Sequence, residues 1–170
     1  SSQPNRLATA TVAALSTDQV QALRTNQLNS LNTAGIAALS TNQATALTTE
    51  QVNNLTTAAV QALSTTTVSV LGTDQIQALS TNSLGVLKTA QVQALSTDQV
   101  VALTTGQVAN LSTGTIAALS SKQVGAIETD DIQALSSKQL GSLATSTIAA
   151  LSTDQIVALT TSQFNSLSTS

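Results

Sequence analysis

A single eight-residue unit repeats without interruption through almost the whole chain. Leucine occupies every eighth position from Leu7 to Leu167, with Ile127 as the one substitute, and serine or threonine always stands two positions later. The consensus is Leu-Ser/Thr-Thr-x-Gln-Val/Ile-x-Ala, and we number its places one to eight from the leucine. Such a short fixed period indicates a solenoid, in which each unit buries its apolar side only against neighbouring units.

Helix-start signals recur in these octads. Ser16 at place two and Gln19 three residues later have the spacing of a capping box, and Leu15 and Val20 have the spacing of a hydrophobic staple. The invariant serine or threonine at place three could cap instead. Acidic residues favour a helix N-terminus, and they recur at place four, where Lys122 and Lys138 depart from the pattern: Asp18, Glu50, Asp74, Asp98, Asp130 and Asp154. We therefore expect one helix of about six residues in each octad.

A β-solenoid is the alternative, because threonine, valine and isoleucine favour strands and Val-x-Ala alternates with a period of two. Against it, leucine directly follows alanine, so the two side chains would point to opposite faces of a strand. The seven glycines also occupy no fixed place, although the corners of a β-coil would need them. One continuous helix is excluded, since its apolar stripe would drift by about 80° per octad. The sequence predicts an all-α, open-ended solenoid of short helices, one per octad.

We predict a polar leader at residues 1–6 and one repeat domain at residues 7–170. A longer period of 56 residues, or seven octads, overlies the first, because the segments that begin at Asp18, Asp74 and Asp130 are versions of one sequence. This period indicates duplication of a seven-octad block, or an outward face that returns every seven octads and contacts a partner there. We also expect both ends of the array to expose apolar surface, with Phe164 at the C-terminal end.

The residue types exclude most kinds of chemistry. The chain has no cysteine or histidine, so the usual soft or imidazole metal ligands and cysteine nucleophiles are absent. A net charge of −3 without a basic cluster argues against nucleic-acid binding, and no apolar run is long enough to insert into a membrane. Lys88, Lys122 and Lys138 are scattered. We therefore predict that the protein is no enzyme and has no catalytic, cofactor-binding or metal-binding residues and no cofactor.

Two weaker motifs have simpler explanations. Glu128, Asp130 and Asp131 could hold Ca²⁺ through oxygen ligands, but they lack the spacing of a calcium loop and suit a solvated helix start better. Residues 54–56 and 110–112 fit the N-glycosylation sequon. Their asparagines occupy place eight, which we expect to face the core.

The run ALSTDQVQAL, with its ALTT and LSTxQ variants, resembles octad arrays of very large exported bacterial surface proteins of the adhesin-like kind. The resemblance covers residues 7–170 and carries over no functional residue. It implies an extracellular, bacterial cell-surface setting and a spacer or fibre role. We therefore expect a structural protein that forms a filament, fibre or stalk, with other copies of itself as partners through head-to-tail and lateral contacts. The alternative is a repetitive surface that binds glycans or ice.

Overall fold

The computed structural model describes residues 9–167, and within that range it contains twenty short α-helices and no strand. The predicted helical solenoid with one helix per octad is confirmed, and the β-solenoid alternative is wrong. The leader predicted at residues 1–6 lies outside the described residues. The helices are α1 (Thr9–Ala13), α2 (Thr17–Ala22), α3 (Thr25–Ser30), α4 (Thr33–Ala37), α5 (Thr41–Ala46), α6 (Thr49–Asn53), α7 (Thr57–Ala62), α8 (Thr65–Val70), α9 (Thr73–Ala78), α10 (Thr81–Gly85), α11 (Thr89–Ala94), α12 (Thr97–Val101), α13 (Thr105–Ala109), α14 (Thr113–Ala118), α15 (Ser121–Gly125), α16 (Thr129–Ala134), α17 (Ser137–Leu140), α18 (Thr145–Ile148), α19 (Thr153–Ala158) and α20 (Thr161–Leu167).

Many of the helices begin with the capping box that the sequence predicts. At α12 the Ser96 hydroxyl accepts the Gln99 backbone N–H at 3.2 Å, and Oε1 of Gln99 accepts the Ser96 backbone N–H at 2.8 Å. Place two is therefore the N-cap, and Thr97 at place three is the first helical residue. The predicted box between Ser16 and Gln19 is confirmed at α2.

Two extended residues connect most neighbouring helices. The Leu95 backbone N–H donates to the Val92 carbonyl at 3.1 Å, which closes α11, and both Leu95 (φ −62°, ψ 132°) and Ser96 (φ −72°, ψ 162°) are extended. No described residue has a positive φ. These turns require no glycine, which explains why the glycines occupy no fixed place in the octad.

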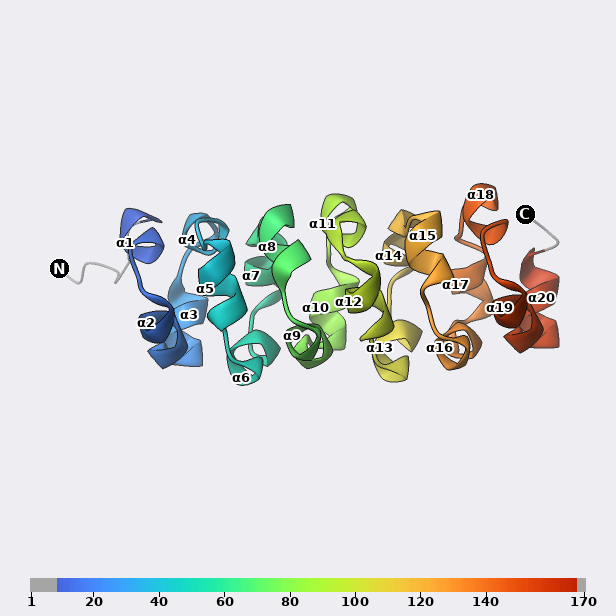
Figure 1. Cartoon of the computed structure of the whole chain (residues 1–170), viewed down its shortest axis with the longest axis horizontal. Helices are drawn as coiled ribbons and strands as arrows, with labels where there is room; N and C mark the ends of the chain where they lie inside the picture. The colour runs from blue at the N-terminus through green and yellow to red at the C-terminus, as the bar shows by residue number, and fades with distance from the viewer. Residues whose placement is uncertain (1–8, 168–170) are drawn as a thin grey trace.

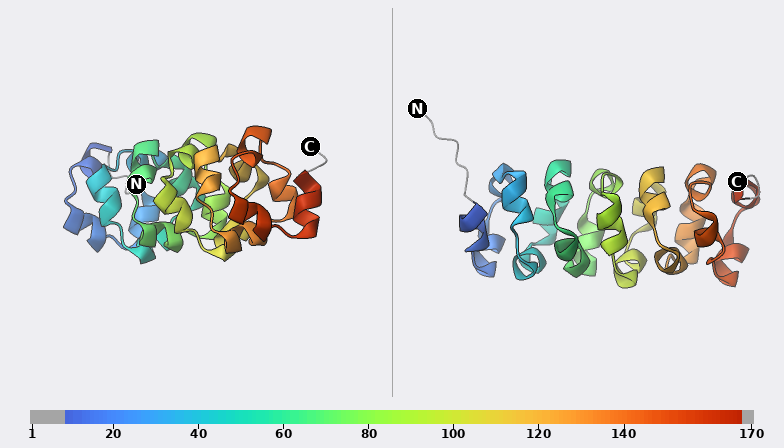
Figure 2. Two further views of the ribbon diagram at one scale, coloured as in Figure 1. Left: turned by 45° about the vertical axis from the view of Figure 1, so that its right-hand side comes forward. Right: turned by 90° about the horizontal axis from the view of Figure 1, so that it is seen from above.

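The helices stack in one row along a single long axis, with α1 and α20 at opposite ends (Figures 1 and 2). Each helix packs on the third helix after it, as α6 does on α9, α8 on α11 and α13 on α16. Along the upper edge of Figure 1 the order is α1, α4, α8, α11, α15 and α18, so the steps of three and four alternate. Seven helices therefore complete two turns of the solenoid.

This two-turn repeat has the same length as the 56-residue period of the sequence, because seven octads span both. Helices seven apart return to the same side of the rod, as α5, α12 and α19 do on the front of Figure 1. The seven-octad period therefore brings equivalent residues back to one outward face. Whether a partner uses that face stays a prediction.

Leucine at place one and valine or isoleucine at place six form one continuous apolar core. Around the middle of the array, Leu95 is 7% exposed and Val92 is fully buried. Alanine at place eight lies at the margin, as the half-buried Ala94 does. The third buried position of the octad is place five, which is mostly glutamine. This position brings polar side chains into the interior of the solenoid. In residues 9–167 no helix is long and apolar enough to cross a membrane.

Candidate functional site

A row of buried side-chain amides, here called the amide ladder, runs through the solenoid. Its members are the place-five glutamines from α5 onward, and each is at most 6% exposed. In each of them Oε1 accepts the backbone N–H of its own N-cap, and Nε2 donates to carbonyls 31 and 28 residues earlier. They are Gln43, Gln51, Gln75, Gln91, Gln99, Gln107, Gln123, Gln139, Gln155 and Gln163.

Gln99 shows how one side chain connects two helices. Its Nε2 donates to the carbonyl oxygens of Val68 at 2.8 Å and Leu71 at 2.7 Å, which lie at the C-terminal end of α8. Its Oε1 meanwhile caps α12. One buried amide therefore satisfies an orphan N–H of its own helix and two carbonyls of the helix four units earlier. Buried polar groups are costly unless they are bonded in this way.

The sequence predicts only the capping half of this arrangement. A capping box accepts glutamate or glutamine equally, because it needs only a side-chain oxygen. A bond to a carbonyl oxygen, by contrast, needs an N–H or O–H donor. Glutamine has such a donor in its amide group, whereas ionised glutamate has none. The signal for the missed half was therefore the recurrence of glutamine at place five without a single glutamate.

Other residues interrupt the ladder without opening the core. Thr67 still donates its hydroxyl to the Leu39 carbonyl, at 3.4 Å, whereas Ala59 offers no side-chain donor. Asp131 is the charged substitute at this place and is only 3% exposed. An aspartate side chain carries no amide N–H. The carbonyls of Val100 and Leu103, which stand 31 and 28 residues before Asp131, therefore lack the amide that the register supplies elsewhere.

The two ends of the described array are chemically unlike. Near the N-terminal end Gln19 is exposed while its neighbour Val20 is fully buried. Near the C-terminal end the pattern reverses: Gln155 is 2% exposed, Ile156 is 36% exposed and Phe164 is 54% exposed. The reason is that places five and six face opposite directions along the solenoid axis. The expectation of exposed large apolar side chains is confirmed at the C-terminal end. The described residues nearest the N-terminus present amides instead, and Leu7, where the array was predicted to begin, lies outside the described residues.

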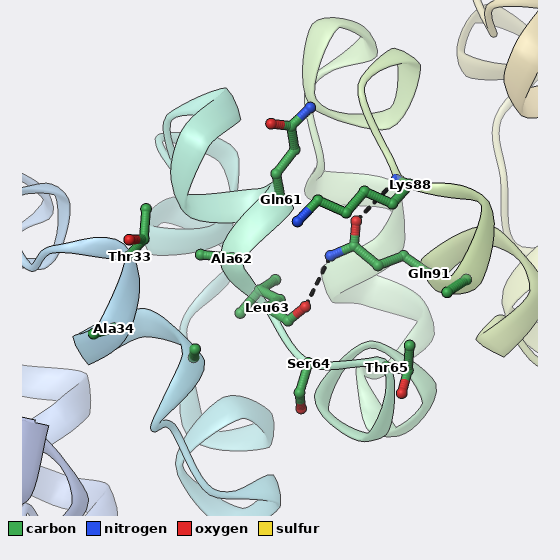
Figure 3. Close-up of a pocket in the computed structure, with 11 residues that line it drawn as sticks. Thr33, Ala34, Gln61, Ala62, Leu63, Ser64, Thr65, Lys88 and Gln91 are labelled. Carbon is green, nitrogen blue, oxygen red and sulfur yellow. Dashed lines mark hydrogen bonds between the residues drawn. The ribbon is translucent and has the colours of Figure 1, made fainter.

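A shallow groove of about 490 Å³ lies between α4, α7 and α11 (Figure 3). Alanines such as Ala34 and Ala62 form apolar parts of its wall, and Figure 3 shows the Lys88 ammonium beside the Gln61 side chain. Lys88 is the one charged side chain among the lining residues, and no carboxylate lies with it. The groove can attract an anionic or polar group, but it holds no acid–base pair.

The other candidate residues are not brought together. Lys122 and Lys138 lie exposed on separate helices, α15 and α17. Within α16 and its N-cap, Glu128 and Asp130 are exposed while Asp131 points into the amide ladder's row. In the described part of the chain no three acidic residues, histidines or cysteines gather where they could hold a metal ion. That the protein has no catalytic, cofactor-binding or metal-binding residues stays a prediction.

The two sequon asparagines lie at exposed helix ends. Asn54 and Asn110 each donate Nδ2 to a carbonyl of their own helix, at 2.8 Å to Glu50 and 2.8 Å to Gly106. The expectation that they face the core is therefore wrong, because place eight turns outward at these two helix ends.

Comparison with protein families matches the chain to a family described as the ALTTAQ repeat. The match occurs five times in tandem, at residues 25–57, 53–81, 81–113, 108–137 and 134–169. Together these segments cover most of the solenoid from α3 to α20. A comparison with curated proteins found no match.

Proposed function

Because the chain belongs to the ALTTAQ repeat family, we propose that it is a structural repeat protein, without catalysis, that acts as a rod in a filament, fibre or stalk. The observation that carries this proposal is the amide ladder, which links every octad it includes to a helix four units away along one axis. Such a device adds length and stiffness with each octad.

The energetics of the fold suit this role. A helix of about six residues is unstable alone, so each unit depends on contacts with neighbouring units. In a solenoid these contacts are nearest-neighbour terms that continue for as long as the octads do. An array of this kind can span a distance without a second domain or a separate core.

We place the rod outside a bacterial cell, at its surface. This setting rests on the resemblance of the octads to those of exported surface proteins. Two sequence features are compatible with it: the chain has no cysteine whose oxidation would matter, and only 8% of its residues are charged. Serine, threonine, asparagine and glutamine cover the exposed places.

Self-association follows from the polarity of the rod. Ile156 and Phe164 are exposed at one end, whereas amides are exposed at the other. A contact between unlike ends is head-to-tail and does not close on itself, so it propagates into a filament. Val101 and Val157 are 42% and 78% exposed and stand 56 residues apart on α12 and α19, on one side of the rod (Figure 1). They offer lateral contact points two turns apart.

Sedimentation velocity across a concentration series, with negative-stain imaging, tests the proposal. We expect an elongated monomer at low concentration and linear particles that lengthen with concentration. A compact particle would contradict the rod. An elongated particle that stays monomeric at every concentration would reject filament assembly and leave the stalk.

A glycan-binding surface is the second candidate, and the groove beside Lys88 favours it. Binding of acidic glycans in an array, lost on Lys88→Ala and kept on Lys122→Ala, would support this function. Equal binding by both variants would assign it to nonspecific charge.

A further inference from the structure

We propose that the junction between two copies continues the amide ladder, with Gln19 and Gln27 of one copy donating to the carbonyl groups of α18 and α19 of the other. This inference rests on the proposed head-to-tail assembly and specifies its register. Several independent observations support it.

The interior supplies a strict rule. Every ladder glutamine donates to two carbonyls of the helix four octads earlier. One belongs to the place-six residue of that helix, and the other belongs to the place-one leucine or isoleucine that follows the helix. The last of them, Gln163, donates to Ile132 at 2.9 Å and Leu135 at 2.6 Å. Since the same register is kept from Gln43 to Gln163, it belongs to the octad itself and not to any particular pair of helices. When a second copy stacks on the end of the first, its glutamines therefore meet carbonyl groups at the same spacing as inside one copy.

The N-terminal face holds donors that are already oriented. Oε1 of Gln19 accepts the Ser16 backbone N–H at 2.9 Å, and Oε1 of Gln27 accepts the Arg24 backbone N–H at 2.9 Å. Both side chains are thus fixed on their own helices as the buried glutamines are. Both are exposed, and neither Nε2 donates to another described residue. Among the described residues, no helix stands four units before either donor.

The C-terminal face holds the matching acceptors. The ladder glutamines reach no helix later than α16, and in the register of the ladder α18 and α19 would each take an amide from a helix four units later. The carbonyls of Ile148 and Ile156 already accept one backbone N–H each, from Leu151 at 3.1 Å and Leu159 at 3.2 Å, as place-six carbonyls do in the interior. Counting onward from α20, Gln19 would meet Ile148 and Leu151.

Counting on in the same way, Gln27 would meet the carbonyls of Ile156 and Leu159. The two glutamine donors of the N-terminal face therefore correspond to two pairs of carbonyl acceptors on the C-terminal face. The donors and the acceptor pairs follow each other in the same order along the chain.

The apolar contacts fit the same register. Inside the array, place five of one helix covers place six of the third helix before it: a Cβ built on Gly35 would lie 3.5 Å from Cγ2 of Val12. Continued across the junction, Gln19 covers Ile156 and Gln27 covers Phe164, the two core-type side chains that the C-terminal face leaves open. The opposite pairings, donor face to donor face or acceptor face to acceptor face, leave these groups without partners. The junction is therefore specific for a second copy in the same orientation.

The double variant Gln19→Glu with Gln27→Glu tests the register. Each glutamate keeps the oxygen that caps its helix but loses the donor, and its charge would face two carbonyl oxygens. We expect the concentration at which particles form to rise at least about tenfold, with the unfolding midpoint of the monomer unchanged. The matched control is Gln21→Glu with Gln77→Glu, which adds the same charge at exposed place-seven positions and should assemble as the wild type does.

A cross-link measures the junction directly. The chain has no cysteine, and Gln27 and Phe164 lie near opposite ends of the rod, so a disulfide between Gln27→Cys and Phe164→Cys can form only between copies. We expect oxidation to give covalent chains, whereas Gln77→Cys with Phe164→Cys should not. Particles that assemble normally with the Glu pair and do not cross-link would overturn the register and leave the filament standing. A wild-type protein that never assembles would reject both.

Discussion

Nε2 of Gln99 lies 2.7 Å from the carbonyl oxygen of Leu71, 28 residues earlier in the chain. This bond joins α12 to α8 across a full turn of the solenoid, and the same relationship recurs at every ladder glutamine. The helices that it joins are too short to be stable alone. The long-range amides and the core between them therefore carry the stability of the rod.

Replacing Gln99 by alanine should destabilise the protein by about 2–4 kcal/mol, because three hydrogen bonds disappear and two buried carbonyls lose a donor. The measurement is the free energy of unfolding from urea titration. Gln93→Ala is the matched control, since that side chain is exposed, and its effect should stay below about 0.5 kcal/mol. Equal effects of the two changes would show that the ladder bonds contribute no net stability.

Replacing Leu95 by alanine should lower the free energy of unfolding by about 2–5 kcal/mol. Leu95 is 7% exposed, and its loss leaves a cavity in a core to which each octad contributes only two large apolar side chains. Val101→Ala controls for the removal of apolar surface as such, because Val101 is 42% exposed. Its effect should be within about 0.5 kcal/mol. Thermal unfolding followed by circular dichroism reports both. A mild Leu95→Ala would contradict the assignment of the buried face.

The sequence predicted one short helix in each octad, and it left the cap open between places two and three. Ser16 and Gln19 gave the helix start, and the leucine period gave one helix per unit, because both are local or strictly periodic signals. The pitch could not be predicted, since the fractional number of octads per turn depends on how neighbouring helices pack. The carbonyl contacts of Gln99 were also missed, because they join residues whose proximity exists only once that pitch is set. For the same reason the exposure of Gln19 near the N-terminal end was not predicted.

Ala144→Ser should stabilise α18 by about 0.5–1 kcal/mol. Ala144 is the N-cap of that helix and makes no side-chain cap, whereas Ser112, the N-cap of α14 four helices earlier, accepts the Thr115 backbone N–H at 3.1 Å. A serine hydroxyl would accept the equivalent N–H of Thr147. Ala150→Ser, at an exposed position outside the cap, should change the unfolding free energy little. Chemical denaturation of the two variants side by side makes the comparison, and equal effects would exclude capping as the cause.

The sharpest test of the amide ladder is to complete it. Asp131 is 3% exposed and occupies a place where Gln75, two turns earlier, donates to Ala44 at 2.9 Å and Leu47 at 2.7 Å. Asp131→Gln would supply the missing amide to Val100 and Leu103, and its Oε1 would accept the N-cap N–H. The same change replaces the carboxyl group of a side chain that is 3% exposed by a neutral amide.

We expect Asp131→Gln to stabilise the protein by about 1–3 kcal/mol at neutral pH, whereas the reverse change Gln75→Asp should destabilise it by at least as much. Asp130→Asn is the control for loss of one negative charge, because Asp130 is exposed on the same helix. It should have an effect near zero or slightly unfavourable, since an acidic residue in the first turn favours the helix. Urea titration of the three variants separates hydrogen bonding from charge. If Asp131→Gln were neutral while Gln75→Asp was severe, the carboxyl of Asp131 would already satisfy its surroundings, and the ladder would not be the reason that glutamine recurs at place five.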